Sequence, residues 1–292
     1  MAVPKYRGPA LRPSGPGEPG PEQPRPAPIR EELKELWIHR ELLLQFSFND
    51  LKHRYFGSSI GVFWMVVNPI VELVTYTFVF HVLMGVTFRP QGGITNYSLF
   101  LFCGMVAWFA VAEGLTRATT SVTEHSHLIK KVNFPASVLP AHVVLSAVFN
   151  QAVRTVILAL GAIFFGGGLS AHFLLVPVAI LLQTFFVLGL AFFLATANVY
   201  FRDASHWVNA VLLAWMFVTP IFYPHDAYPP QFNLLLQANP LAHVVGIYHE
   251  LVLNQRMPHI HQLLALPIFS AGSFIIGFSV FAHHRKRFAD LT

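Results

Sequence analysis

Three ionisable side chains lie inside long apolar stretches of the sequence, and they are the first candidates for chemistry. They are Glu72, Glu113 and Arg154, and Asn150 stands one helical turn before the arginine. A charge near the centre of a bilayer costs from ~3 to over ~10 kcal/mol, so such residues face a cavity or a partner. Two interpretations stay open: these residues line a polar path across the membrane, or they include a buried structural Glu–Arg pair.

The fifteen histidines raise the question of a metal centre. The closest groupings are His125 with His127, His259 with His261, and His283 with His284. Residues one or two apart do not share a helical face, no HExxH pair is present, and the chain has a single cysteine, Cys103. We therefore expect no metal site and no intrachain disulfide.

The phosphate-binding loop GxxxxGK[ST] is absent, because no glycine is followed by lysine anywhere in the chain. We also find no clustered acid–base set suited to catalysis. The sequence therefore predicts a protein that is not an enzyme and that carries no cofactor. If an ATP-driven pump is involved, its motor is another chain.

Aromatic residues make up 14% of the chain. Most are explained by the Trp and Tyr belts expected at membrane interfaces. A minority are candidates to line a passage, since flat aromatic faces suit the C–H faces of sugar rings and stacking is weakly directional. These candidates are Trp64, Tyr76, Trp108, Phe222 and Tyr223.

The elements that must position these residues are apolar and continuous. The chain is 54% hydrophobic and 11% charged, against roughly 25% charged residues in soluble domains, and its mean hydropathy is +0.53. Six stretches approach the ~20 residues that a bilayer core requires. They cover about 60–84, 97–119, 138–165, 172–199, 206–223 and 262–282. We predict an all-α polytopic membrane protein with six transmembrane helices.

The basic residues indicate the orientation of these helices. They gather in the first 57 residues, at Lys130 and Lys131, at Arg202 and in 285–287, whereas the alternate loops hold only Arg89 and Arg256. The positive-inside rule therefore places both termini in the cytoplasm. Because the basic residues flank apolar spans, we expect membrane lipids and not nucleic acid as their partners.

The two ends of the chain differ from this core. Residues 1–30 hold nine of the 21 prolines and predict a disordered tail, and residues 286–292 form a short C-terminal tail. Residues 31–56 predict an amphipathic helix that lies in the cytoplasmic interface or packs on protein; both alternatives stay open. Its candidate interface residues are Trp37, Arg40, Lys52, Arg54 and Tyr55.

The segment 224–261 is too apolar for an exposed loop and too rich in proline for one membrane span. Asn239 followed by Pro240 is typical of a helix start, and we expect that helix to end near Arg256. Short re-entrant or interfacial helices on the outer face would fit, between spans five and six.

Four segments together resemble the membrane subunit of ABC-2 type polysaccharide exporters, the Wzm, KpsM and TarG-like permeases. The resemblance covers roughly residues 36–285, which contain the predicted transmembrane domain 57–285. Its motifs are RELLLQFSFNDLKHRYFGSSIGVFWMVVNPI from residue 40, HLIKKVNFPASVLP at 127–140, ANVYFRDASHW at 197–207 and TPIFYP at 219–224. The proline-rich tail departs from the family, and we assign it no family role.

This resemblance implies that residues 127–135 form a coupling helix that docks on a separate ATPase subunit. The residues it assigns to this coupling are His127, Leu128, Ile129, Lys130, Lys131, Asn133 and Phe134, with Arg202 and Asp203 as a second, shorter contact. It also implies two copies of this chain with two ATPase subunits that bind ATP and Mg, a lipid-linked polysaccharide as substrate, and the bacterial plasma membrane as location.

Three alternatives remain beside this one. An ABC-2 exporter of a drug or small lipid would use the same machinery. A membrane-embedded enzyme acting on lipid-linked sugars would need a clustered acid–base set, which is not found. A secondary transporter would show inverted repeats and paired broken helices, and neither is evident in the sequence.

Overall fold

The computed structural model describes residues 29–55, 61–83, 97–131 and 134–291. Within these ranges every regular element is a helix. The proline-rich tail 1–28, the turn 57–60 and Asn133 lie outside the described residues, so the predictions made for them stay predictions.

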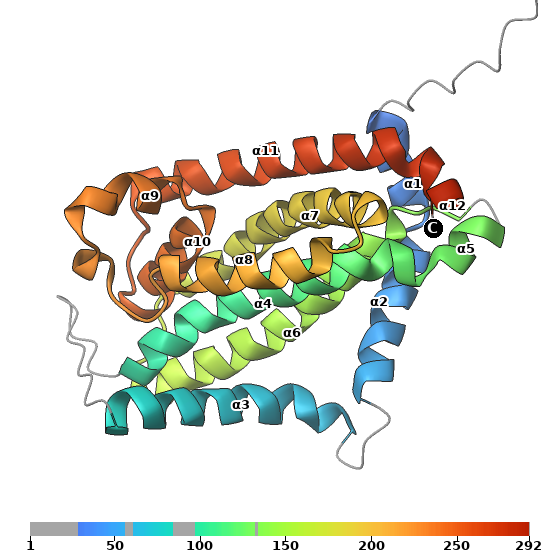
Figure 1. Cartoon of the computed structure of the whole chain (residues 1–292). Coiled ribbons are helices and arrows are strands. Elements are labelled where there is room, and N and C mark those ends of the chain that lie inside the picture. Colours follow the sequence, from blue (N-terminus) through green and yellow to red (C-terminus); the bar gives the residue numbers. More distant parts are fainter. Residues whose placement is uncertain (1–28, 56–60, 84–96, 132–133, 292) are drawn as a thin grey trace, which may run out of the picture.

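Each of the six apolar stretches contains a helix (Figure 1). The helices are α3 (Trp64–Tyr76), which continues as the π-helical η2 (Thr77–Leu83), α4 (Tyr97–Glu124), α6 (Val138–Phe165), α7 (Val176–Tyr200), α8 (Ala204–Val218) and α11 (Ile260–His284). Four of them, α4, α6, α7 and α11, are long and apolar enough to cross a membrane, while α3 and α8 are shorter. The protein is therefore an all-helical multi-pass membrane protein, and six crossings remain a prediction.

The core is built around α4, which packs against α6, α7, α8 and the short helix α10 (Pro240–Tyr248). Side chains along the whole length of α4 are buried, among them Cys103, Val111 and Ala118. On the side of α7 that faces away from α4, the backbone of α11 contacts the backbone of α7 closely. A Cβ built on Gly277 would overlap the carbonyl of Gly189. Lipid offers no hydrophobic drive for helix association, and small residues allow the close packing that replaces it.

Local signals explain where several helices begin and end. Gly167 and Gly168, at φ +84° and +106°, reverse the chain after α6 in a conformation that other residues rarely adopt. Pro177 stands in the first turn of α7, where its missing N–H costs nothing. The predicted start at Asn239 and Pro240 is confirmed, because the Asn239 side chain accepts a hydrogen bond from the Leu241 N–H at 3.0 Å.

The N-terminal stretch forms two helices rather than one. α1 (Ile29–Ile38) and α2 (Arg40–Tyr55) meet at a turn at His39. The apolar residues Leu44 and Phe48 of α2 stay exposed, while Phe46 and the fully buried Ser47 pack on the protein. The helix α2 therefore packs on the protein with one face and leaves apolar side chains exposed on another. Figure 1 shows α2 running across the bundle helices, near the ends of α4 and α6.

The remaining short helices gather at opposite ends of the bundle (Figure 1). At one end lie α1, α5 (Ser126–Lys131), η7 (Arg285–Arg287) and α12 (Phe288–Leu291), and we call it the elbow end. At the other lie η4 (His225–Ala227), η5 (Pro230–Phe232), α9 (Asn233–Ala238), α10 and η6 (His249–Leu253). The prediction of short helices in 224–261 is confirmed; α10 and η6 are buried in the bundle.

Candidate functional site

The helix α5 turns the chain between α4 and α6 at the elbow end. It ends before the predicted boundary of 135, because Phe134 and Pro135 are not helical. The ring of a proline disfavours helical backbone geometry in the residue that precedes it. Leu128, Ile129 and Phe134 pack into a cluster with the ends of α6, α7 and α11. His127 and Lys130 are exposed, and nothing is described of the Lys131 side chain. The apolar residues Leu128, Ile129 and Phe134 anchor the elbow, while the side chains of His127 and Lys130 face outward.

The C-terminal helix α12 supports this elbow. Phe288 is fully buried and meets the Phe281 ring edge-on, with centroids 5.1 Å apart. α12 also packs against α5 and α7. An ion pair of 2.5 Å between Arg285 and Glu35 joins α1 to the same end. The sequence assigned no role to residues 286–292, since only the folded chain brings them beside residues 126–131.

The predicted second contact, Arg202 and Asp203, lies in the turn between α7 and α8. Both residues are exposed. Tyr200, at the end of α7, meets the ring of His284 at 5.4 Å, so this turn also belongs to the elbow end. The two segments that the sequence assigned to ATPase coupling therefore share one end of the molecule.

A charged cluster joins α2 to α4 and α6. Arg54 pairs with Glu113 and, at 3.1 Å, with Asp50, and Asp50 also pairs with Arg117. Asn150 donates a hydrogen bond to Glu113 at 2.8 Å, and Tyr55 donates one to Asn150 at 3.4 Å. Burial alone would lower the pKa of Arg54, but the carboxylates of Glu113 and Asp50 outweigh it and raise that pKa.

This cluster changes the grouping of the predicted residues. Arg54 and Tyr55 were assigned to the interface helix and Glu113 and Asn150 to the membrane, yet the structure brings the four together. Of the other interface candidates, Trp37 is 70% exposed and Arg40 lies over its ring at 5.4 Å. Lys52 is exposed as well.

The Glu–Arg pair left open by the sequence is present between α3 and α6. Arg154 donates to Glu72 at 2.7 Å, and its guanidinium lies 4.3 Å from the centre of the Phe109 ring on α4. The two charges thereby compensate each other, and the ring face of Phe109 adds a cation–π contact to Arg154.

A fully buried polar network lies deeper in the bundle. The side-chain amide of Gln151 donates to the side-chain oxygen Oε1 of Gln183 at 2.9 Å and to the hydroxyl of Tyr248 at 2.7 Å. Gln183 in turn donates to the Ala107 carbonyl at 2.9 Å. These bonds connect α4, α6, α7 and α10 without a charge, and none of the residues in this network was among the predicted site residues.

The five aromatic candidates are spread along the molecule. Trp64 begins α3, Tyr76 ends it, and Trp108 is buried in the middle of α4. Phe222 and Tyr223 follow α8 at the end opposite the elbow, where Tyr97 donates to the Phe222 carbonyl at 2.9 Å. Trp108 is thus a core residue, and its position does not support a role in lining a passage.

At this same end, Glu250 on η6 forms an ion pair with Arg256, which follows η6 in the chain. Arg256 donates to the Glu250 carboxylate through two nitrogens, one at 3.0 Å. Burial alone would raise the pKa of Glu250, but hydrogen bonds from Arg256 and Asn254 outweigh it and hold that pKa below its ordinary value. This carboxylate therefore stays charged and paired.

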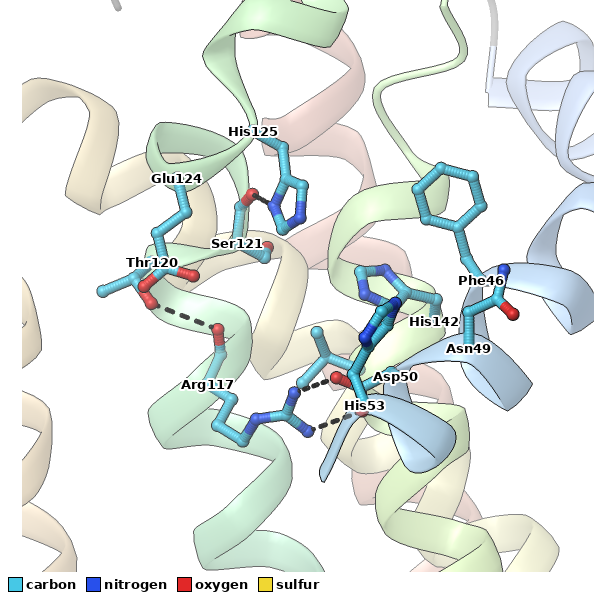
Figure 2. A pocket seen from close by; sticks show the side chains of 11 residues that line it. Phe46, Asn49, Asp50, His53, Arg117, Thr120, Ser121, Glu124, His125 and His142 are labelled. Carbon is cyan, nitrogen blue, oxygen red and sulfur yellow. Dashed lines mark hydrogen bonds and ion pairs between the residues drawn. The ribbon is translucent and has the colours of Figure 1, made fainter. Parts of the chain in front are cut away.

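A pocket of about 450 Å³ lies between α2, α4 and α6 at the elbow end (Figure 2). Its polar lining includes Asn49, Asp50, Arg117, Glu124, His125 and His142. Sequence analysis missed it, because its residues come from three separate helices. Of the two histidines considered as a metal pair, His125 lines the pocket and His127 does not. The described residues contain no group of three or more His, Cys, Asp and Glu that could hold a metal ion.

A helical bundle with four helices long and apolar enough to span a membrane, internal ion pairs and a short helix that turns the chain at one end defines the class of multi-pass membrane proteins. Comparison with known proteins narrows this class. A model of the ABC-2 type transporter family matches residues 42–253, and the chain belongs to that family. The resemblance inferred from the sequence motifs is thereby confirmed.

Curated relatives extend the match over most of the chain. The O-antigen export system permease protein RfbA of Myxococcus xanthus is 30% identical over 260 residues, which cover 88% of this chain and 98% of that protein. Two RfbA proteins of Klebsiella pneumoniae are 30% and 28% identical over 253 residues each, which cover 86% of this chain and 95% of theirs.

Proposed function

We propose that this chain is the permease subunit of an ATP-driven exporter of a lipid-linked polysaccharide. The observation that carries the proposal is the match to O-antigen export permeases over nearly their whole length. The substrate is of the O-antigen class or a related capsule, teichoic acid or galactan. The glycan is presented on a lipid that lies in the same bilayer as the permease.

The assembly we propose contains two copies of this chain and two ATPase subunits. ATP and Mg are bound by the ATPase, since this chain has no phosphate-binding loop. Six helices cross the bacterial plasma membrane, and both termini lie in the cytoplasm. This topology is supported by the common position of α5, α12 and the α7–α8 turn at the elbow end.

The elbow end supplies the contact with the ATPase. His127 and Lys130 on α5 and the exposed pair Arg202 and Asp203 face outward, whereas Leu128 and Ile129 of α5 are partly buried and pack against the bundle. A helix anchored in this way moves as one body with α4 and α6. Closure of the two ATPase subunits on ATP would therefore be transmitted to the membrane helices rather than absorbed by a loose loop.

The proposal is tested by reconstitution in liposomes with the ATPase encoded beside this chain. We expect ATP-dependent appearance of lipid-linked glycan in the outer leaflet and none without the ATPase. Glycan transfer by the permease alone, or transport of small lipids but never of glycan-bearing ones, would contradict the proposal.

The elbow assignment has its own test. Reversing both charges with Lys130→Glu and Lys131→Glu should weaken co-purification of the ATPase while the protein still inserts into the membrane. The matched control, Lys5→Glu with Arg7→Glu, changes net charge equally in the N-terminal tail and should leave co-purification intact. Equal ATPase recovery from both variants would remove α5 from the interface.

A further inference from the structure

The pocket between α2, α4 and α6 has no role in the function proposed above. Its volume of about 450 Å³ lies within the ~300–1,000 Å³ typical of ligand sites. It lies at the base of the elbow, because Glu124 is the last residue of α4 and His125 is the turn that leads into α5. Figure 2 shows side chains from the three helices converging on this space.

Two histidines in the pocket present hydrogen-bond acceptors. The Nδ1 atom of His125 lies 2.9 Å from the Ser121 carbonyl, and that of His142 lies 3.1 Å from the Val138 carbonyl. A carbonyl oxygen can only accept, so each Nδ1 carries the proton in the neutral ring and each Nε2 keeps its lone pair. His142 is only 4% exposed, and it lines the pocket.

The charged residues of the pocket also favour a neutral ligand that donates hydrogen bonds. Arg117 donates two hydrogen bonds to Asp50, one of them 3.0 Å long, so its positive charge is already paired with that carboxylate. The Glu124 carboxylate forms no hydrogen bond or ion pair within the described part of the chain and adds two more acceptor oxygens. A phosphate would be repelled by this carboxylate, while the charge of Arg117 in the lining is already paired with Asp50. A ligand that carries several hydroxyl donors matches the lining.

We propose that this pocket binds a saccharide unit, which donates its hydroxyl groups to His125, His142 and Glu124. The inference rests on the proposed export function and assigns the pocket to the membrane-proximal sugar of the glycan. A sugar held there would bridge the interface helix α2 to the start of α5. Substrate loading and the position of the ATPase contact would then be linked directly.

The binding test uses the permease–ATPase complex in nanodiscs and saturation-transfer NMR with methyl pyranosides of glucose, galactose, mannose and N-acetylglucosamine. We expect saturation transfer to at least one pyranoside, which neither inorganic phosphate nor ethanolamine displaces. His142→Phe and His125→Phe keep a ring but remove the acceptor, and each should weaken binding about fivefold, the equivalent of one neutral hydrogen bond. His283→Phe, on the exposed end of α11, is the matched control and should bind as the native chain does.

Glu124→Gln separates saccharide from charged ligands. An amide still accepts from a hydroxyl, so saccharide binding should change less than about fivefold, whereas an ammonium ligand would lose its counter-charge and a phosphate would bind better. Displacement by phosphate or ethanolamine, or no transfer to any pyranoside in a monodisperse complex, would overturn the inference. If that complex still exports glycan, the proposed function stands and only the pocket assignment fails; if export is absent as well, the proposed function itself fails.

Discussion

The helices α4, α6, α7, α10 and α11 form a tightly packed frame, whereas α3 and α8 lie at its margin. In the frame, the backbones of α7 and α11 touch at Gly189 and Gly277, and a buried amide network crosses four helices. At the margin, large apolar side chains point away from the protein, as Val74 does on α3 and Trp207 on α8.

The difference lies in how each part is held. Interlocking backbone and side-chain shapes secure the frame, so moving one of its helices would require the others to repack. The marginal helices bury few side chains, Pro69 on α3 and Val208 and Leu212 on α8. Polar contacts add to this packing: Arg154 with Glu72 for α3, and Asn209 and Trp215 for α8. Because less of their surface is buried against the protein, we expect α3 and α8 to shift more easily than the helices of the frame.

The largest effect should come from filling the closest contact in the frame. In Gly277→Ala the new methyl group collides with the backbone of Gly189, and overpacking of this kind costs typically about 1–3 kcal/mol and sometimes more. We expect a large fall in thermal stability in detergent, which is measured by size-exclusion chromatography after heating. Gly272→Ala, one turn or so earlier on α11 with open space around its Cβ, is the control. Equal stability of the two variants would mean that the frame is not closely packed there.

A smaller effect should follow loss of the ion pair at the margin. Breaking a fully buried pair costs about 3–5 kcal/mol, but the side chains of Arg154 and Glu72 are 13% and 28% exposed, so we expect less for Arg154→Met. The double variant Arg154→Met with Glu72→Gln should recover part of the loss, because no unpaired charge remains. The measurement is a double-mutant cycle of thermal stability. A double variant that loses the sum of both single effects would contradict a direct pair.

The contact between α8 and α10 should matter less again. Asn239 caps α10 and also accepts from Trp215 at 2.8 Å and donates to Thr219 at 3.1 Å. Asn239→Ala should destabilise the protein by about 1–2 kcal/mol, the value of a helix cap. The control is Asn233→Ala at the exposed start of α9. If both variants unfold at the same temperature, Asn239 does not secure α8.

The smallest effect should come from the exposed bond between Thr116 and Asn209, which is 3.1 Å long. Surface substitutions usually stay within about 0.5 kcal/mol, so Asn209→Ala should unfold at nearly the native temperature. A loss as large as that of Arg154→Met would show that α8 is held as firmly as α3 and would remove the distinction between the two marginal helices.

Much of the fold could be predicted from the sequence. The apolar stretch predicted at 138–165 coincides with α6, and the start of α10 at Pro240 was predicted from its asparagine cap. These features are local, because a run of apolar residues or a capping side chain acts within a few turns of its own helix. The four sequence motifs, taken together and in their order, likewise indicated the family, which the comparisons confirm.

The partners of the polar residues were decided only by the tertiary structure. Arg54 and Glu113 are 59 residues apart, Glu72 and Arg154 are 82 apart, and Tyr55 and Asn150 are 95 apart. Periodicity places each residue on a face of its own helix, but the crossing of helices determines which faces meet. For the same reason the pocket at the base of the elbow, and the support of α5 by α12, become visible only in the folded chain.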